Sequence, residues 1–190
     1  PEAILLTRAI LLTKTRLKQY SINDIKEALH QIPHSKKDYV QHLENLLMEA
    51  ESWHLFTTAY DFFSSLIRPG EITIVDLSFL NSTHLKQIIT GIIAELLFYK
   101  RIKQRKKEEF QKIKGCKQKE TDPFIWLAID EAHLFLPEQQ DSYVKEILLH
   151  NWLRQGRQPG LSILMATQRP SFMDQEVLSH SDLVLCHRLT

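Results

Sequence analysis

The chain has 190 residues, of which 43% are apolar and 25% are charged, and its formal net charge is +1. These values are typical of a soluble globular protein and exclude an intrinsically disordered chain. The longest apolar stretch, residues 88–99, is too short to span a bilayer and contains Glu95. The two cysteines form no CxxC pattern and no signal peptide is recognisable, so we expect a reduced, cytoplasmic protein. A first residue other than Met suggests a fragment of a longer protein.

Residues 1–69 are predicted to form a helical lobe. Apolar residues recur there at helical spacing in three successive segments. Ser21, with Asp24 three residues later, predicts a capped helix start with a variant of the capping box. Pro33 and the Pro69-Gly70 pair interrupt the pattern.

Residues 70–190 show a different organisation, in which short β-branched runs alternate with longer amphipathic segments. Strands are predicted at residues 72–77, 124–129, 161–167 and 182–189, and helices at about 82–110, about 140–155 and 173–179. This alternation predicts an α/β fold with a mostly parallel sheet flanked by helices.

Residues 100–119 form a basic run with ten Lys or Arg residues against Glu108 and Glu109. Such a run is typical of a solvated helix surface, and it also suits a patch that contacts phosphates. Phe110 is its only aromatic residue, which does not indicate stacking of single-stranded bases.

Residues 124–136, FIWLAIDEAHLFL, predict a buried strand that ends in Asp130 and Glu131. Open parallel sheets bind ligands at the carboxyl ends of their strands. Adjacent carboxylates there suit a nucleotide-bound Mg²⁺, with Asp130 holding the ion or its water and Glu131 orienting the attacking water. His133 has no second ligand nearby and is interpreted as structural. Trp126 and Trp152 are interpreted as packing residues.

A phosphate-binding loop of the form GxxxxGK[ST] is absent from the 190 residues, since none of the five glycines precedes Lys-Ser or Lys-Thr. Two explanations stay open. The loop precedes residue 1 in a longer protein, or the protein is a degenerate ATPase.

Residues 154–174, RQGRQPGLSILMATQRPSFMD, place two arginines at a helix end, then a buried strand, then ATQRP at the end of that strand. Gln168 is predicted to lie one strand away from the carboxylates. A glutamine there can hydrogen-bond the γ-phosphate or the attacking water.

IDEAH, the following FLP, RQGR, ATQRPS and the terminal HRL occur in this chain with an order and spacing that resemble the FtsK-HerA superfamily, and its HerA branch in particular. These are hexameric, ring-shaped ATPases that pump DNA. The resemblance covers residues 70–190 and implies a RecA-like core, ATP with Mg²⁺, a homo-hexamer, sequence-independent contact with the DNA backbone, and a NurA-like nuclease partner. DEAH-box RNA helicases share only IDEAH, because they carry an SAT-type motif in place of ATQRP.

The resemblance also implies a role for individual residues. Asp130 corresponds to the magnesium carboxylate, Glu131 to the catalytic carboxylate and Gln168 to the sensor glutamine. Arg157 and Arg154 match arginines that could stabilise γ-phosphate charge, within one subunit or across the ring interface. Arg188 lies in the HRL match without an assigned role. The alternatives are a ring ATPase of conjugation or secretion and a degenerate, non-hydrolysing subunit.

Overall fold

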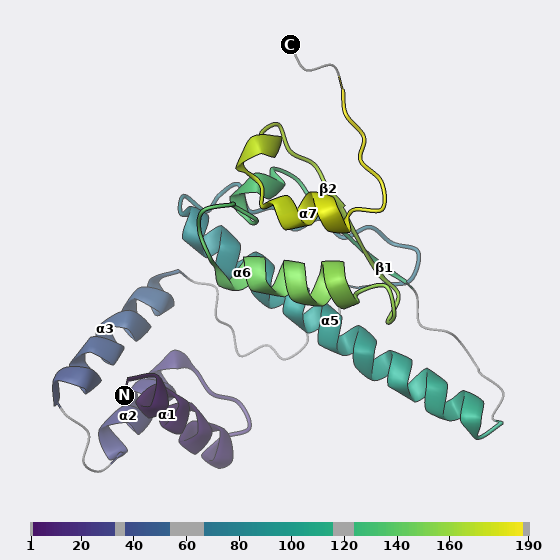
Figure 1. The fold of residues 1–190 in the computed structure, drawn as a ribbon. Coiled ribbons are helices and arrows are strands. Elements are labelled where there is room, and N and C mark those ends of the chain that lie inside the picture. Colours follow the sequence, from purple (N-terminus) through teal and green to yellow (C-terminus); the bar gives the residue numbers. More distant parts are fainter. Residues whose placement is uncertain (1, 33–36, 54–66, 116–123, 188–190) are drawn as a thin grey trace. The chain divides into compact units, whose positions relative to one another are not determined.

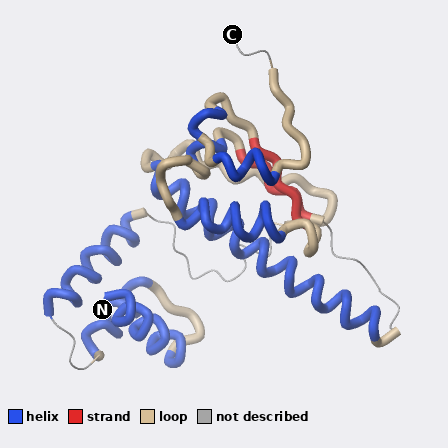
Figure 2. Tube along the Cα trace, viewed as in Figure 1, coloured by secondary structure: helices blue, strands red, loops and turns tan. Residues whose placement is uncertain are grey.

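The computed structural model describes residues 2–32, 37–53, 67–115 and 124–187. The chain divides into two compact units, Pro1–Thr73 and Ile74–Thr190, and each is described by itself (Figure 1). Helices predominate in the described residues, and the strands belong to the second unit (Figure 2). The chain is therefore a helix-rich α/β protein.

The first unit contains three described helices: α1 (Glu2–Arg16), α2 (Ile22–Gln31) and α3 (Lys37–Ser52). Each helix contributes two buried residues to a shared apolar core, formed by Leu5, Ala9, Ala28, Leu29, Val40 and Leu43. The predicted capping box at the start of α2 is confirmed. The Ser21 backbone N–H donates to the Asp24 carboxylate at 2.6 Å, and the Ser21 side chain accepts from the Asp24 backbone N–H.

The second unit is built on two parallel strands, β1 (Ile125–Ile129) and β2 (Leu161–Met165). Their register runs from Ile125 opposite Leu161 to Ile129 opposite Met165, so both strands end at the same edge. Between them the chain forms α6 (Tyr143–Glu146), which continues as the π-helical segment η2 (Ile147–Leu153). Residues 124–165 thus form the predicted strand–helix–strand unit.

The long helix α5 (Thr83–Ile113) precedes β1 and packs along α6 and η2 (Figure 1). Buried Trp152 of η2 donates its indole N–H to the Ala94 carbonyl at 3.0 Å. At Gly91 the two helices approach so closely that a Cβ would lie 2.7 Å from the Tyr143 ring. Only glycine therefore allows this crossing without displacement of the Tyr143 side chain.

Two of the four predicted strands are not formed by the described residues. Residues 71–76 and 182–187 have no regular secondary structure, and residues 188 and 189 lie outside the described part. Ile72 is 92% exposed and Leu185 is exposed as well. A strand requires a neighbouring strand to which its backbone is hydrogen-bonded, and no described strand forms a sheet with either segment. The described part therefore contains a two-stranded parallel sheet in place of the predicted full RecA-like sheet.

One face of this small sheet is exposed. Trp126 on β1 is 71% exposed, and Leu164 on β2 is exposed beside Ala128, its register partner. The interpretation of Trp126 as a packing residue is wrong for the described structure, whereas Trp152 is buried as predicted. The opposite face is covered because η2 packs against β2.

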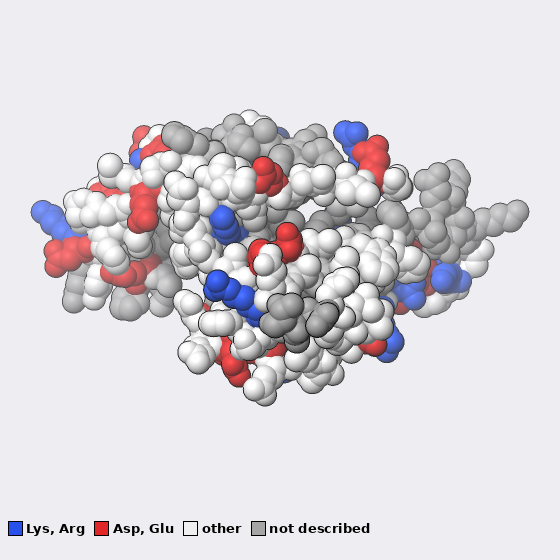
Figure 3. Space-filling view, turned by 90° about the horizontal axis from the view of Figure 1, so that it is seen from above, with Lys and Arg blue, Asp and Glu red and all other residues white. Residues whose placement is uncertain are grey.

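Short segments complete the second unit after each strand: η1 (Ala132–Leu134), η3 (Pro170–Phe172) and α7 (Gln175–His180). None of the described helices is both long and apolar enough to cross a membrane. On the face presented in Figure 3, both basic and acidic side chains are visible.

Candidate functional site

The carboxyl ends of β1 and β2 bring together Glu131 and Gln168, two of the predicted site residues. Asp130 and Glu131 follow β1 directly, while Thr167 and Gln168 lie just beyond β2. Two backbone hydrogen bonds of 2.9 Å hold the strand ends together. The Ala166 N–H donates to the Ile129 carbonyl, and the Ala132 N–H donates to the Ala166 carbonyl.

Glu131 and Gln168 are in direct contact. The Gln168 side-chain amide donates from Nε2 to Glu131 Oε1 at 3.0 Å. A carboxylate whose first oxygen accepts from a fixed amide has a defined orientation, which leaves its second oxygen to interact with another group.

The second oxygen, Glu131 Oε2, is buried and accepts no hydrogen bond from the protein. His133 Nδ1 lies 3.3 Å from it, but the same nitrogen lies closer to Thr167 Oγ1, at 3.0 Å. A ring nitrogen carries at most one proton. Of the two contacts of His133 Nδ1, the one with Thr167 Oγ1 is shorter, so we take Thr167 as the hydrogen-bond partner of His133. Oε2 therefore keeps acceptor capacity for a further hydrogen-bond donor.

Glu131 also has an unusual backbone conformation. It has φ 49° and ψ 45°, and it is the one residue other than glycine with positive φ in the described part of the chain. The left-handed region is unfavourable for a residue with a Cβ by about 1–2 kcal/mol. Strained backbone of this kind is concentrated at functional sites, where the surrounding structure maintains it.

Asp130 is exposed at the strand end and has spare acceptor capacity. Its Oδ1 accepts from the Glu131 backbone N–H at 2.9 Å. No group of three or more His, Cys, Asp or Glu side chains suited to a metal occurs among the described residues. Carboxylates, waters and phosphates are the ligands that commonly hold Mg²⁺, so the exposed Asp130 carboxylate has suitable donor chemistry for this ion.

Arg154 and Arg157 are not brought to the carboxylates. Both precede β2, whereas Gln168 follows it, so they lie toward the opposite edge of the sheet from Glu131. Arg154 pairs with Glu176 of α7, to which its Nε donates at 2.6 Å. Arg157 reaches only Asp182, at 3.5 Å, and its side chain is 89% exposed. The described arrangement therefore gives neither arginine a place beside Glu131 within its own chain.

Two contacts near the site were not anticipated from the sequence. Thr167 is paired with His133, and buried Gln87 of α5 donates from Nε2 to the Leu134 carbonyl at 2.7 Å. Gln87 thereby fixes the turn that follows Glu131 to α5. Thr167 could have been found from its place beside Gln168 in ATQRP, but Gln87 carries no local signal because its partner lies 47 residues away.

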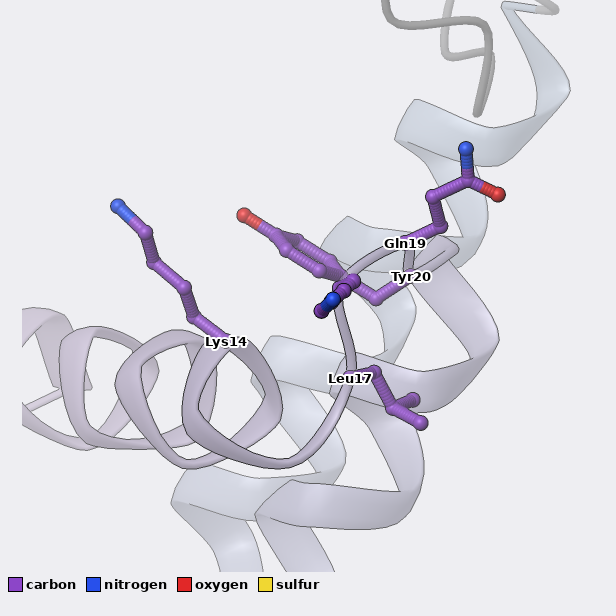
Figure 4. Close-up of a pocket in the computed structure, with 5 residues that line it drawn as sticks. Lys14, Leu17, Gln19 and Tyr20 are labelled. Carbon is purple, nitrogen blue, oxygen red and sulfur yellow. The ribbon is translucent and has the colours of Figure 1, made fainter.

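A pocket is also present in the first unit, between the end of α1 and the start of α2 (Figure 4). It is lined by Lys14, Leu17, Lys18, Gln19 and Tyr20. It contains no carboxylate or nucleophile from the candidate site. We therefore treat the strand-end cluster as the functional centre.

A pair of carboxylates facing a glutamine across the carboxyl ends of parallel strands is an arrangement found in α/β nucleotide-hydrolysing proteins. The DNA double-strand break repair helicase HerA of Pyrococcus furiosus is 24% identical to this chain over an alignment of 139 residues, which covers 65% of this chain and 25% of that protein. The chain thus spans about a quarter of that relative's length. No family model matches the chain. The similarity indicates a distant HerA-like relation.

Proposed function

We propose that this chain carries the carboxylate and sensor half of an ATP-hydrolysing site in a HerA-like motor that acts on DNA. The observation that supports this most is the hydrogen bond between Glu131 and Gln168 at the strand ends. It joins the acidic strand and the ATQRP strand, the two elements that a γ-phosphate sensor and a catalytic carboxylate require.

In this proposal Glu131 orients the water that attacks the γ-phosphate. Gln168 holds one carboxylate oxygen, and the unsatisfied Oε2 is free to accept a hydrogen bond from that water. Asp130 holds Mg²⁺ directly or through a water. When bound, Mg²⁺ neutralises phosphate charge that develops during the transfer.

Arg157 is proposed to act on the site of a neighbouring subunit. The Arg157 side chain is exposed, and Arg157 precedes β2, whereas the carboxylates lie at the other end of the strands. This position suits a group that reaches across an interface between subunits. Arg154 is held by Glu176, so we propose that it supports the same helix end. The motor would then function as a homo-hexamer and, by the same resemblance, cooperate with a NurA-like nuclease.

A degenerate subunit is a second candidate because the 190 residues contain no GxxxxGK[ST] loop. Such a subunit would retain the fold and lack turnover. A ring ATPase of conjugation or secretion would share the same chemistry and differ in what it transports. Substitutions at the site distinguish an ATP-hydrolysing protein from an inactive subunit. They do not distinguish which substrate a hydrolysing motor transports.

The test is steady-state ATP hydrolysis by the intact protein in the presence of Mg²⁺. Glu131→Gln keeps the size and hydrogen bonding of the side chain but removes the basic carboxylate, so turnover should fall by about 10²- to 10⁴-fold. Glu138→Gln is the matched control, since Glu138 is exposed in the same loop region and its carboxylate accepts from Gln175, away from the strand ends. Retention of more than about a tenth of the turnover by Glu131→Gln would exclude it as the catalytic carboxylate.

A further inference from the structure

In the second half of α5 the charged residues of the basic run fall into two groups: arginines paired with glutamates, and exposed lysines. Its acidic residues are paired with arginines: Arg101 donates to Glu108 Oε1 at 2.7 Å, and Arg105 lies 3.2 Å from Glu109 Oε1. The Arg101 hydrogen bond holds the pKa of Glu108 below its ordinary value, so this carboxylate stays ionised. Arg101 and Glu108 are buried. The arginines are thus engaged within the protein.

The lysines of the same segment lie elsewhere on the helix. Lys103, Lys106, Lys107 and Lys114 are exposed, and none of them forms an ion pair with another residue in the described part of the chain. Lys106 and Lys107 follow Lys103 by three and four residues, and Lys114 follows Lys107 by seven, which places the four lysines along one side of a helix. An unneutralised row of four ammonium groups is complementary to a polyanion.

Two exposed aromatic side chains lie on the same side as these lysines. Tyr99 is 57% exposed and precedes Lys103 by four residues, and Phe110 is 58% exposed and follows Lys103 by seven. Lys114 Nζ lies 4.5 Å from the centroid of the Phe110 ring, so the charge and the ring form one surface. Phe110 is the aromatic residue within the basic run itself. Tyr99 directly precedes the run and lies on the same side of α5.

We infer that this surface, the α5 stripe (Tyr99, Lys103, Lys106, Lys107, Phe110 and Lys114), binds single-stranded DNA. Lysines that follow the phosphate backbone, with aromatic rings on which bases stack, are the features by which proteins hold single strands without sequence preference. A duplex keeps its bases stacked inside and would give Tyr99 and Phe110 no partner. The stripe is about 22 Å long at 1.5 Å per residue, enough for several successive phosphates.

The second half of α5 extends beyond α6 and η2, which pack along its other part (Figure 1). The stripe occupies this extended part and shares no residue with the nucleotide site. The inference rests on the proposed function for the choice of DNA as the polyanion. Its test contains no ATP, so a failure of DNA binding and a failure of hydrolysis are distinguishable.

The experiment measures binding of the intact protein to a fluorescent strand of about 20 thymidines at several salt concentrations. Replacing Lys103, Lys106, Lys107 and Lys114 with Gln should reduce the slope of log affinity against log salt by about 0.7 for each lost phosphate contact, or up to about 3 in all. The matched control replaces Lys14, Lys18, Lys37 and Lys112 with Gln. These lysines are exposed, change the net charge equally and lie off the stripe, so the slope should stay as in the wild type.

A second variant, Tyr99→Leu with Phe110→Leu, tests the rings. It should weaken binding by about 5- to 150-fold for each stacked base and leave the salt slope unchanged, while the melting temperature confirms folding. Three results would overturn the inference. In the first, the control variant reduces the salt slope as much as the lysine variant does. In the second, a duplex of equal length binds as tightly as the single strand and the ring variant has no effect. In the third, binding to phosphatidylserine vesicles is measured in parallel, and the stripe variants reduce only that binding.

Discussion

At the scale of single residues, Glu131 combines a functional side chain with an unfavourable backbone. Its left-handed conformation reduces stability, and it belongs to the residue that we propose as the catalytic carboxylate. Active sites commonly retain such local instability because function requires the exact placement of the group.

Glu131→Gly should therefore be more stable than Glu131→Ala. Glycine adopts positive φ without steric penalty, so we expect the free energy of unfolding to exceed that of Glu131→Ala by about 1 kcal/mol. The alanine variant is the control, since it removes the same carboxylate and retains the Cβ. Urea denaturation of the two variants measures the difference, and equal stabilities would show that positive φ at this position is not maintained in solution.

At the scale of elements, the features that depend on neighbouring residues were predictable from the sequence. The capping box at Ser21 and Asp24 is confirmed because its partners lie three residues apart. The strands at residues 125–129 and 161–165 follow their apolar runs, and the intervening connection forms a helix. The meeting of Glu131 with Gln168 follows from the parallel arrangement of these strands.

Features that depend on distant partners were not predictable. Residues 72–77 have the composition of a strand, but composition cannot say whether a neighbouring strand is present to pair with them. The same reason applies to residues 182–187. The pairing of His133 with Thr167 and the positive φ of Glu131 arise from the tertiary arrangement at the strand ends, for which IDEAH contains no local signal.

The segment after β2 is held to α6 by an ion pair. Lys145 Nζ lies 2.8 Å from Asp174 Oδ2, and both side chains are largely buried. The hydrogen bond from Lys145 holds the pKa of Asp174 below its ordinary value. Burial disfavours the charged form of Lys145, but the hydrogen bond and charge of Asp174 outweigh it and raise the pKa of Lys145.

Asp174→Asn should lower the free energy of unfolding by about 2 kcal/mol at neutral pH, because Lys145 is left with longer contacts, 3.5 Å to exposed Asp141 and 3.3 Å to the Glu138 carbonyl. A lowered pKa in the folded state means that the stabilisation by Asp174 is present above about pH 4 and is lost as the pH falls through that pKa. Thermal unfolding of wild type and variant should differ at pH 7, and the difference should shrink as the pH falls below about 4. A difference that persists in acid, or an equal effect of Asp141→Asn, would contradict this account.

At the scale of the whole molecule, the position of Arg157 makes a prediction about assembly. If Arg157 completes the site of a neighbouring subunit, Glu131→Gln and Arg157→Ala subunits should complement each other when mixed. In a ring assembled at random from equal amounts, about a quarter of the interfaces contain both intact groups, so turnover should recover toward about a quarter of the wild-type value. Each variant alone is the control. Mixtures as inactive as the separate variants would place Arg157 in the site of its own subunit or outside the site.

The central claim is that Glu131 and Gln168 act as one hydrolytic unit, and a double-mutant cycle on kcat for ATP hydrolysis tests it most directly. Turnover of the intact protein is measured for Glu131→Gln, for Gln168→Ala and for the two combined, with nucleotide binding measured separately for each. Since Gln168 is proposed to act by orienting Glu131, its removal should matter little once the carboxylate is gone, and the double variant should be about as slow as Glu131→Gln alone. Effects of the two changes that multiply in full would contradict the claim, because they would show that the two side chains contribute to turnover independently.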